Sequence, residues 1–197
     1  MKILLIILSV LLLIFAIVQI FAMKGQNNIE SYPYTVEKEY DNFEVRQYEA
    51  SLFTSVKLST KEYKEASSKG FSILAGYIFG GNEKEEKIAM TSPVAMSLED
   101  SMTVMFMVPK KYNKETLPKP NQSEIAFEEV PAKRVAAITF GGWSDDDKIE
   151  KYKTLLIAAL EAKGIAYTNR FYFLGYNPPY EVFNRKNEVI VELEEHS

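Results

Sequence analysis

The stretch GYIFGGNEKEEKIAMTSPVAM, from Gly76 to Met96, decides the expected fold. It starts as the end of an apolar helix, stops at Gly80-Gly81, passes through a run of charges and resumes as Met-Thr-Ser-Pro-Val. Glycines end helices because they adopt left-handed backbone conformations readily, and a proline limits strand pairing at its own position. The order therefore predicts a helix, a solvated turn and a strand rather than a catalytic loop.

Two helices are expected, over residues 61–79 and 145–163. Ser59 and Ser144 each precede an acidic residue by three positions, which is the pattern of a helix-capping box. These two serines are 85 residues apart, and the strand-like segment 102–108 recurs at the same distance as 187–193. The shared spacing indicates an internal repeat.

Two more features keep this spacing: Pro93 corresponds to Pro178, and the pair Glu44-Val45 corresponds to Glu129-Val130. Each half then contains two strands, a helix and two further strands. The expected fold class is α+β, with about eight or nine strands forming a distorted β-barrel and two helices related by a pseudo-two-fold axis.

The chain opens with 21 uncharged residues from Ile3 to Met23. As a helix this stretch would be about 31 Å long, close to the thickness of the hydrocarbon core of a bilayer. It exceeds the apolar region of a cleaved signal peptide, so an uncleaved transmembrane anchor is favoured over a signal. Lys2 favours a cytoplasmic N-terminus and an extracytoplasmic domain. The expected organisation is an anchor over 1–24, a linker over 25–33, a domain over 34–193 and a tail over 194–197.

Composition excludes several functions. Beyond the anchor the chain has 21 basic and 27 acidic residues, a net charge of −6, which argues against nucleic-acid binding. The chain has no cysteine, so thiolate chemistry is excluded. Its only histidine, His196, is next to the terminus. Neither a histidine-based catalytic site nor a histidine metal site is expected, and the protein is not predicted to be an enzyme.

The first expected helix is apolar over a wider arc than one packed face needs. Phe71, Ala75 and Phe79 are spaced four residues apart, beside the core stripe of that helix. This flank either packs against another strand or forms one wall of an apolar groove. In the second case, Lys64 and Ser68 lie along the same flank, where the lysine could meet an anionic end of a flat ligand. The methionines between 90 and 107 fill the core or form a flexible groove floor.

Three segments resemble the SOUL haem-binding protein family. They are YIFGGNEKEEKIAMTSPV over 77–94, FEVRQYEASLF over 43–53 and GYNPPYEVFNRKNEVIVEL over 175–193, and the likeness runs from Tyr34 to Leu193. The family fold is a distorted β-barrel built from two halves with two helices. Relatives bind haem and other porphyrins in a groove between the first helix and the loop before the last strand.

The resemblance implies a tetrapyrrole site at the Phe71 flank and the loop 175–183, which adds Tyr176 and Tyr180 to the candidates. A histidine proposed as an iron ligand in the family is replaced here by Gln47, and positions that are basic in other relatives hold Ser68, Gly76 and Glu181. We expect a membrane-anchored tetrapyrrole-binding protein without histidine ligation. The alternatives are a non-porphyrin ligand in the same fold, or an envelope interaction protein without a small ligand.

Overall fold

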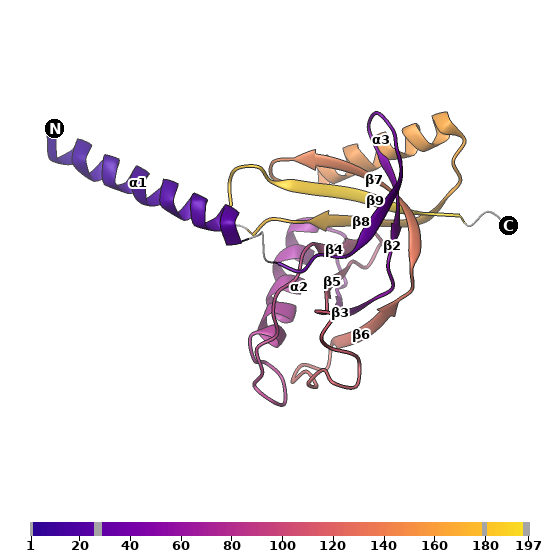
Figure 1. Cartoon of the computed structure of the whole chain (residues 1–197), viewed down its shortest axis with the longest axis horizontal. Helices are drawn as coiled ribbons and strands as arrows, with labels where there is room; N and C mark the ends of the chain where they lie inside the picture. The colour runs from indigo at the N-terminus through magenta and orange to yellow at the C-terminus, as the bar shows by residue number, and fades with distance from the viewer. Residues whose placement is uncertain (1, 26–28, 179–180, 195–197) are drawn as a thin grey trace.

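The computed structural model describes residues 2–25, 29–178 and 181–194, without the side chains of 5, 16–18 and 20–25 (Figure 1). The helices are α1 Lys2–Gly25, α2 Tyr63–Ile78 and α3 Asp146–Lys163. The strands are β1 Tyr34–Glu39, β2 Glu44–Tyr48, β3 Ser51–Lys57, β4 Val94–Ser97, β5 Thr103–Met107, β6 Ile125–Val130, β7 Lys133–Gly141, β8 Tyr167–Gly175 and β9 Lys186–Leu193.

All nine strands form one antiparallel sheet in the order β1-β2-β7-β9-β8-β4-β5-β3-β6. Without the edge strand β1, this order is symmetric about the β8–β4 pair: β9 corresponds to β5, β7 to β3 and β2 to β6. The strand order thus follows the order that a sequence repeat predicts. The two halves also exchange one strand each. Strand β2 of the first half pairs with β7 of the second, and β6 of the second half pairs with β3 of the first.

The predicted distorted barrel is an open one: the sheet curls into a half-barrel, since its edge strands β1 and β6 do not pair with each other in the described part of the chain. One detail of the predicted repeat is wrong. The expected equivalence of Pro93 and Pro178 fails, because the first precedes β4 whereas the second follows β8. The chain needs 15 residues between α2 and β4 but only three between α3 and β8, so the 85-residue spacing is lost at these central strands.

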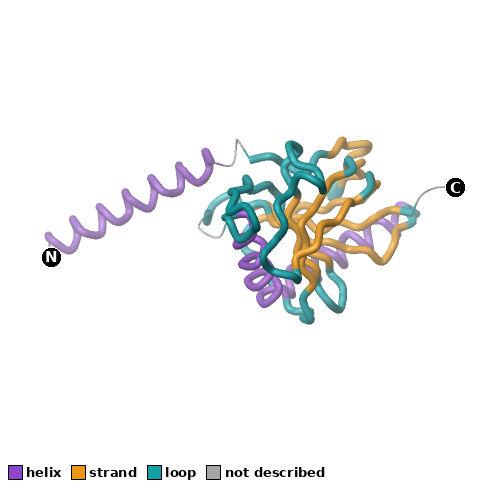
Figure 2. The backbone as a smooth tube through the Cα atoms, turned by 90° about the horizontal axis from the view of Figure 1, so that it is seen from below, coloured by secondary structure: helices purple, strands orange, loops and turns teal. Residues whose placement is uncertain are grey.

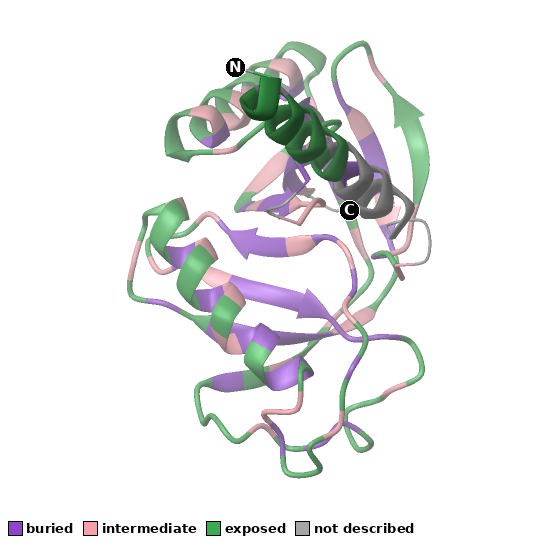
Figure 3. Cartoon of the chain, turned by 90° about the vertical axis from the view of Figure 1, so that its left-hand side faces the viewer, coloured by how far each residue is buried: buried purple, intermediate pink, exposed green. Residues whose placement is uncertain are grey.

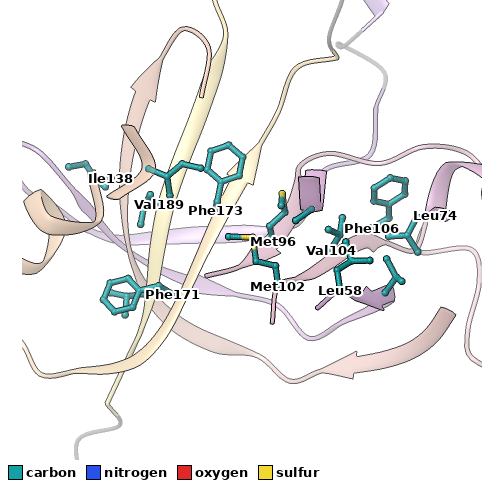
Figure 4. Close-up of a cluster of buried hydrophobic side chains, with 14 of the residues drawn as sticks. Leu58, Leu74, Met96, Met102, Val104, Phe106, Ile138, Phe171, Phe173 and Val189 are labelled. Atoms are coloured by element: carbon teal, nitrogen blue, oxygen red, sulfur yellow. The ribbon is translucent and has the colours of Figure 1, made fainter. Parts of the chain in front are cut away.

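One face of the sheet carries α2 and α3, and the larger hydrophobic cluster lies beneath them (Figure 2). Figure 4 shows one group around Leu74 and Phe106 and another around Phe171 and Phe173, with Met96 and Met102 between the two. Figure 3 shows the strands beneath α2 as mostly buried. Met96 and Met102 are therefore core-filling residues, as one of the two interpretations predicts.

Glycines allow α2 to approach the sheet and to end where it does. A Cβ atom on Gly70 would lie 2.4 Å from Cγ2 of Val104 on β5, which is too close for any other residue. A Cβ atom on Gly81 would lie 2.7 Å from the carbonyl oxygen of Gly76. The buried side chain of Asn82 then organises the charged turn, because its amide donates to the carbonyls of Tyr77 and Glu86.

Both helices start differently from the prediction. Helix α2 begins at Tyr63 after Glu62, which has no side-chain cap, and Ser59 takes no part in capping. At α3 the capping side chain is Asp145, which accepts from the N–H of Lys148, rather than Ser144. Gly164 does end α3 in the left-handed conformation, with φ of 63°.

Helix α1 occupies the predicted N-terminal segment and projects away from the rest of the molecule (Figure 1). Its described apolar side chains from Ile3 to Phe15 are 46–75% exposed. Near its end, Gln19 accepts from the N–H of Val182, and the rings of Phe15 and Phe183 meet edge to face. The expected transmembrane span is not found: within the described residues, no helical stretch combines the length and apolar character that crossing a bilayer requires.

Candidate functional site

The candidate residues on α2 form a stripe along one side of the helix, and their burial is uneven. Lys64 and Ser68 are exposed, and Lys64 makes no ion pair with a described residue. Phe71 is half-buried and its ring meets Phe106 edge to face at 5.3 Å between centroids. Ala75 is buried, whereas Phe79 is 60% exposed. The stripe therefore belongs to the core at its middle and to the surface at both ends.

The segment 88–92 links the C-terminal end of α2 to the loop before β9. The N–H of Ile88 donates to the carbonyl of Ile78 at 2.8 Å, and the hydroxyl of Ser92 donates to the carbonyl of Tyr176 at 3.4 Å. A small hollow of about 10 Å³ lies there, lined by residues that include Tyr77. That volume holds about one water molecule, so a flat ligand beside α2 would lie on the open surface rather than in this hollow.

The loop 176–185 is organised by a single arginine. The guanidinium of Arg185 donates to the carbonyls of Pro178 and Glu181, at 2.9 and 2.7 Å. It also stacks over the ring of Trp143, which precedes α3, at 4.0 Å. Arg185 therefore holds the described part of the loop against Trp143, and the apolar side chains Val182 and Phe183 remain exposed.

Tyr176 is separated from the α2 stripe because its hydroxyl points into the opposite face of the sheet. It donates to the carboxylate of Glu188 at 2.6 Å. Burial, followed by the charge of that carboxylate, raises the pKa of Tyr176 well above its usual value. Tyr176 is thus a half-buried donor on the side of the sheet away from α2. Tyr180 and His196 lie outside the described residues.

Glu188 is the centre of a buried charged network that the sequence analysis missed. Its two carboxylate oxygens each accept a 2.9 Å hydrogen bond from the guanidinium of Arg46, and one of them accepts a further hydrogen bond from the hydroxyl of Thr139 at 3.0 Å. Burial favours the neutral acid, yet the bonds from Arg46 and the charge of Lys186 hold the pKa of Glu188 below its usual value. The signal was available in the sequence, since strand alternation places Glu188 on the same face of β9 as the apolar Ile190.

Gln47, at the position of the proposed family iron ligand, makes a local contact only. Its side-chain amide donates to the carbonyl of the next residue, Tyr48, at 3.3 Å. It lies on β2, which is several strands away from β3 and β5, the strands under α2. Among the described residues no group of three or more histidine, cysteine, aspartate or glutamate side chains is arranged to hold a metal ion.

The comparison with known families now bears on this geometry. Residues 29–192 match the family model for the SOUL heme-binding protein, which is most of the chain. The chain belongs to the SOUL family. It is 28% identical over 166 residues to heme-binding protein 2 of Mus musculus, covering 80% of each chain. It is 30% identical over 162 residues to heme-binding protein 1 of Xenopus laevis, covering 78% of this chain and 84% of that protein.

The fold is also similar to that of a solved structure. The EcmrR C-terminal domain aligns with a TM-score of 0.62 at 12% identity, covering 83% of this chain and 99% of that domain. At this identity the likeness concerns the fold alone. The SOUL assignment thus agrees with the curled sheet and two covering helices.

Proposed function

We propose that this protein binds haem or related tetrapyrroles without catalysing a reaction on them. The observation that carries the proposal is membership of the SOUL family over residues 29–192, with relatives named heme-binding proteins 1 and 2. The function is one of binding because the candidate surface offers apolar contact and a cation, and its described residues present no nucleophile paired with a base.

The proposed site is the surface of α2 facing the loop before β9. Phe71 and Phe79 supply apolar contact on either side of the buried Ala75, and Phe79 is free to stack because it is 60% exposed. Lys64, together with Ser68, is placed to receive a propionate at the N-terminal end of the stripe. Tyr176 and Tyr180 remain candidates through the loop, although the hydroxyl of Tyr176 is already bonded to Glu188.

We further propose that residues 3–23 hold the protein in a membrane with its domain outside the cytoplasm. This proposal rests on the sequence, which has 21 consecutive uncharged residues there. The exposed apolar side chains between Ile3 and Phe15 would find an apolar environment in lipid. Attachment would place the tetrapyrrole site close to the membrane surface.

The test is a titration of the protein with haem and with metal-free protoporphyrin. Because the described residues include no histidine, affinity should come mainly from apolar burial and stacking. The two dissociation constants should then agree within about tenfold, or about 1.4 kcal/mol. A much larger preference for haem would indicate an iron ligand, and binding of neither would favour a different apolar ligand in the same fold. Recovery of intact porphyrin after incubation would separate binding from catalysis.

A further inference from the structure

A second, larger hollow lies on the face of the sheet that carries no helix. Its volume is about 420 Å³, within the range of pockets that hold small ligands. The floor is apolar and comes from the smaller hydrophobic cluster: Phe53, Ala95, Met105, Leu174 and Ile190. The nine-stranded sheet separates this cavity from α2, so it is a different site from the one proposed for tetrapyrroles.

One wall of the cavity carries a buried hydroxyl without a partner. Tyr32 is only 5% exposed, and no described residue hydrogen-bonds its hydroxyl. Its ring is fixed edge to face against Phe53 at 5.0 Å and tilted against Tyr48 at 4.4 Å. Buried polar groups in proteins are nearly always satisfied. A rigidly held, unsatisfied hydroxyl beside a cavity therefore indicates a ligand that completes it.

The side chains that line the cavity carry more negative than positive charge. The carboxylate of Glu192 accepts hydrogen bonds from the ammonium of Lys133 at 2.8 Å, the guanidinium of Arg170 at 3.4 Å and the hydroxyl of Tyr172 at 3.1 Å. Both cations of the lining are thus directed to one acid. Of the remaining acids, Glu128 lies on the cavity face opposite Phe53 and accepts from the hydroxyl of Ser55, and no described cation pairs with Glu128 or its neighbour Glu129.

We propose that this cavity binds an aromatic amine in its cationic form. The ring would lie on the apolar floor among the aromatic side chains of Tyr32, Phe53 and Tyr172, whose faces attract cations. An N–H of the amine would donate to the oxygen of Tyr32. The carboxylate of Glu128, which lies opposite Phe53 on the same face of the sheet, would balance its charge, whereas an anion would meet uncompensated negative charge there.

The first experiment compares a cationic with an anionic aromatic probe on the full chain in uncharged detergent. Proflavine, a flat diamino cation, is followed by fluorescence anisotropy, and 1-anilinonaphthalene-8-sulfonate serves as the anion. Proflavine should bind at least tenfold more tightly, a difference of about 1.4 kcal/mol. The double variant Glu128→Gln, Glu129→Gln should lose at least tenfold in proflavine affinity. Its matched control, Glu39→Gln with Glu115→Gln, removes two exposed charges elsewhere and should keep the affinity.

Two further variants test the cavity itself. Tyr32→Phe should weaken proflavine binding about fivefold without lowering the melting temperature, because the hydroxyl it removes has no protein partner. Ala95→Phe should fill the floor and abolish proflavine binding while haem still binds. Equal binding of both probes, or unchanged proflavine affinity in the Glu128/Glu129 and Ala95 variants, would overturn the proposal. Competition between haem and proflavine would overturn it as well, since the cavity would then be the tetrapyrrole site.

Discussion

The backbone N–H of Tyr63, the first residue of α2, donates a 2.8 Å hydrogen bond to the carboxylate of Asp146, the first residue of α3. The two helices of the repeat therefore meet at their N-terminal ends, and one supplies the cap that the other lacks. A carboxylate between two helix N-termini is also stabilised by both helix dipoles. This contact links the halves of the domain across the helical layer.

Asp146→Ala should therefore lower the free energy of unfolding by about 1 kcal/mol, the usual cost of losing a helix cap. Asp147→Ala is the matched control, because it removes the same charge from the same first turn without touching α2. Urea denaturation of both variants measures the difference. Equal destabilisation by the two changes would show that the cost comes from the α3 dipole and not from the contact between the helices.

The buried pair of Arg46 and Glu188 should be costly to break. Arg46→Met leaves a fully buried carboxylate without its main partner and should destabilise the domain by about 3–5 kcal/mol. Arg134→Met breaks the half-exposed pair with Glu37, also on the sheet, and should cost about 0–1 kcal/mol. Chemical denaturation of both variants checks the contrast. A similar small loss in both would mean that water reaches Glu188 readily.

Acid should unfold the domain through the same network. Glu188 has a lowered pKa in the folded state, despite the opposing effect of burial, because Arg46 and Lys186 stabilise its charge. The folded state then binds a proton less readily than the unfolded chain, so the stability from this group is fully present above the unfolded pKa of about 4.3. It is lost as the pH falls through the folded pKa.

Denaturation midpoints measured between pH 7 and pH 3 should show this loss. The Glu188→Gln variant should start from a lower stability at pH 7 and should lose less on acidification, since it has no proton to gain at this position. A pH profile parallel to that of the unmodified protein would assign the acid sensitivity to other carboxylates, such as Glu192, whose pKa is also lowered despite burial, through Lys133 and Tyr172.

The α2 stripe can be tested by separating binding from folding. Phe71→Ala should weaken porphyrin binding by about 1–3 kcal/mol, as loss of a large apolar contact would, with a smaller loss of stability. Leu74→Ala should cost about 2–5 kcal/mol of stability, because Leu74 is fully buried. Each variant needs a melt beside its titration. If Phe71→Ala melts the domain as badly as Leu74→Ala and leaves affinity intact, its contact with Phe106 is purely structural.

The N-terminal segment should be retained and should hold the protein in the membrane fraction. Mass spectrometry of the mature protein would then find the mass of the whole chain, and carbonate washing should not release it. A chain that lacks residues 1–24 should become soluble, because both hydrophobic clusters consist of residues from Tyr32 onward. A mature N-terminus near Gly25 would instead identify a cleaved signal.

Local features were predictable because they depend on neighbouring residues. The glycine pair after α2 and the strand-like segments 102–108 and 187–193, which form β5 and β9, were visible in the chain. The helix starts were predicted wrongly because neighbouring residues offer alternative caps. Asp145, and not Ser144, accepts the capping hydrogen bond of α3. At α2 the accepting carboxylate is that of Asp146, 83 residues away in the sequence. A cap supplied from the other half of the chain leaves no local pattern.

The sequence by itself determined the family, the α+β class, the order of helices and strands and the N-terminal apolar segment, because each follows from patterns along the chain. Only the tertiary structure decided which side chains meet. It directed Tyr176 to Glu188 instead of to α2, paired Arg46 with a glutamate 142 residues away, and placed Tyr32 beside a cavity on the helix-free face. The reason is the curl of the sheet: strand alternation assigns a face to each residue, but the curvature and strand order determine which residues converge on it.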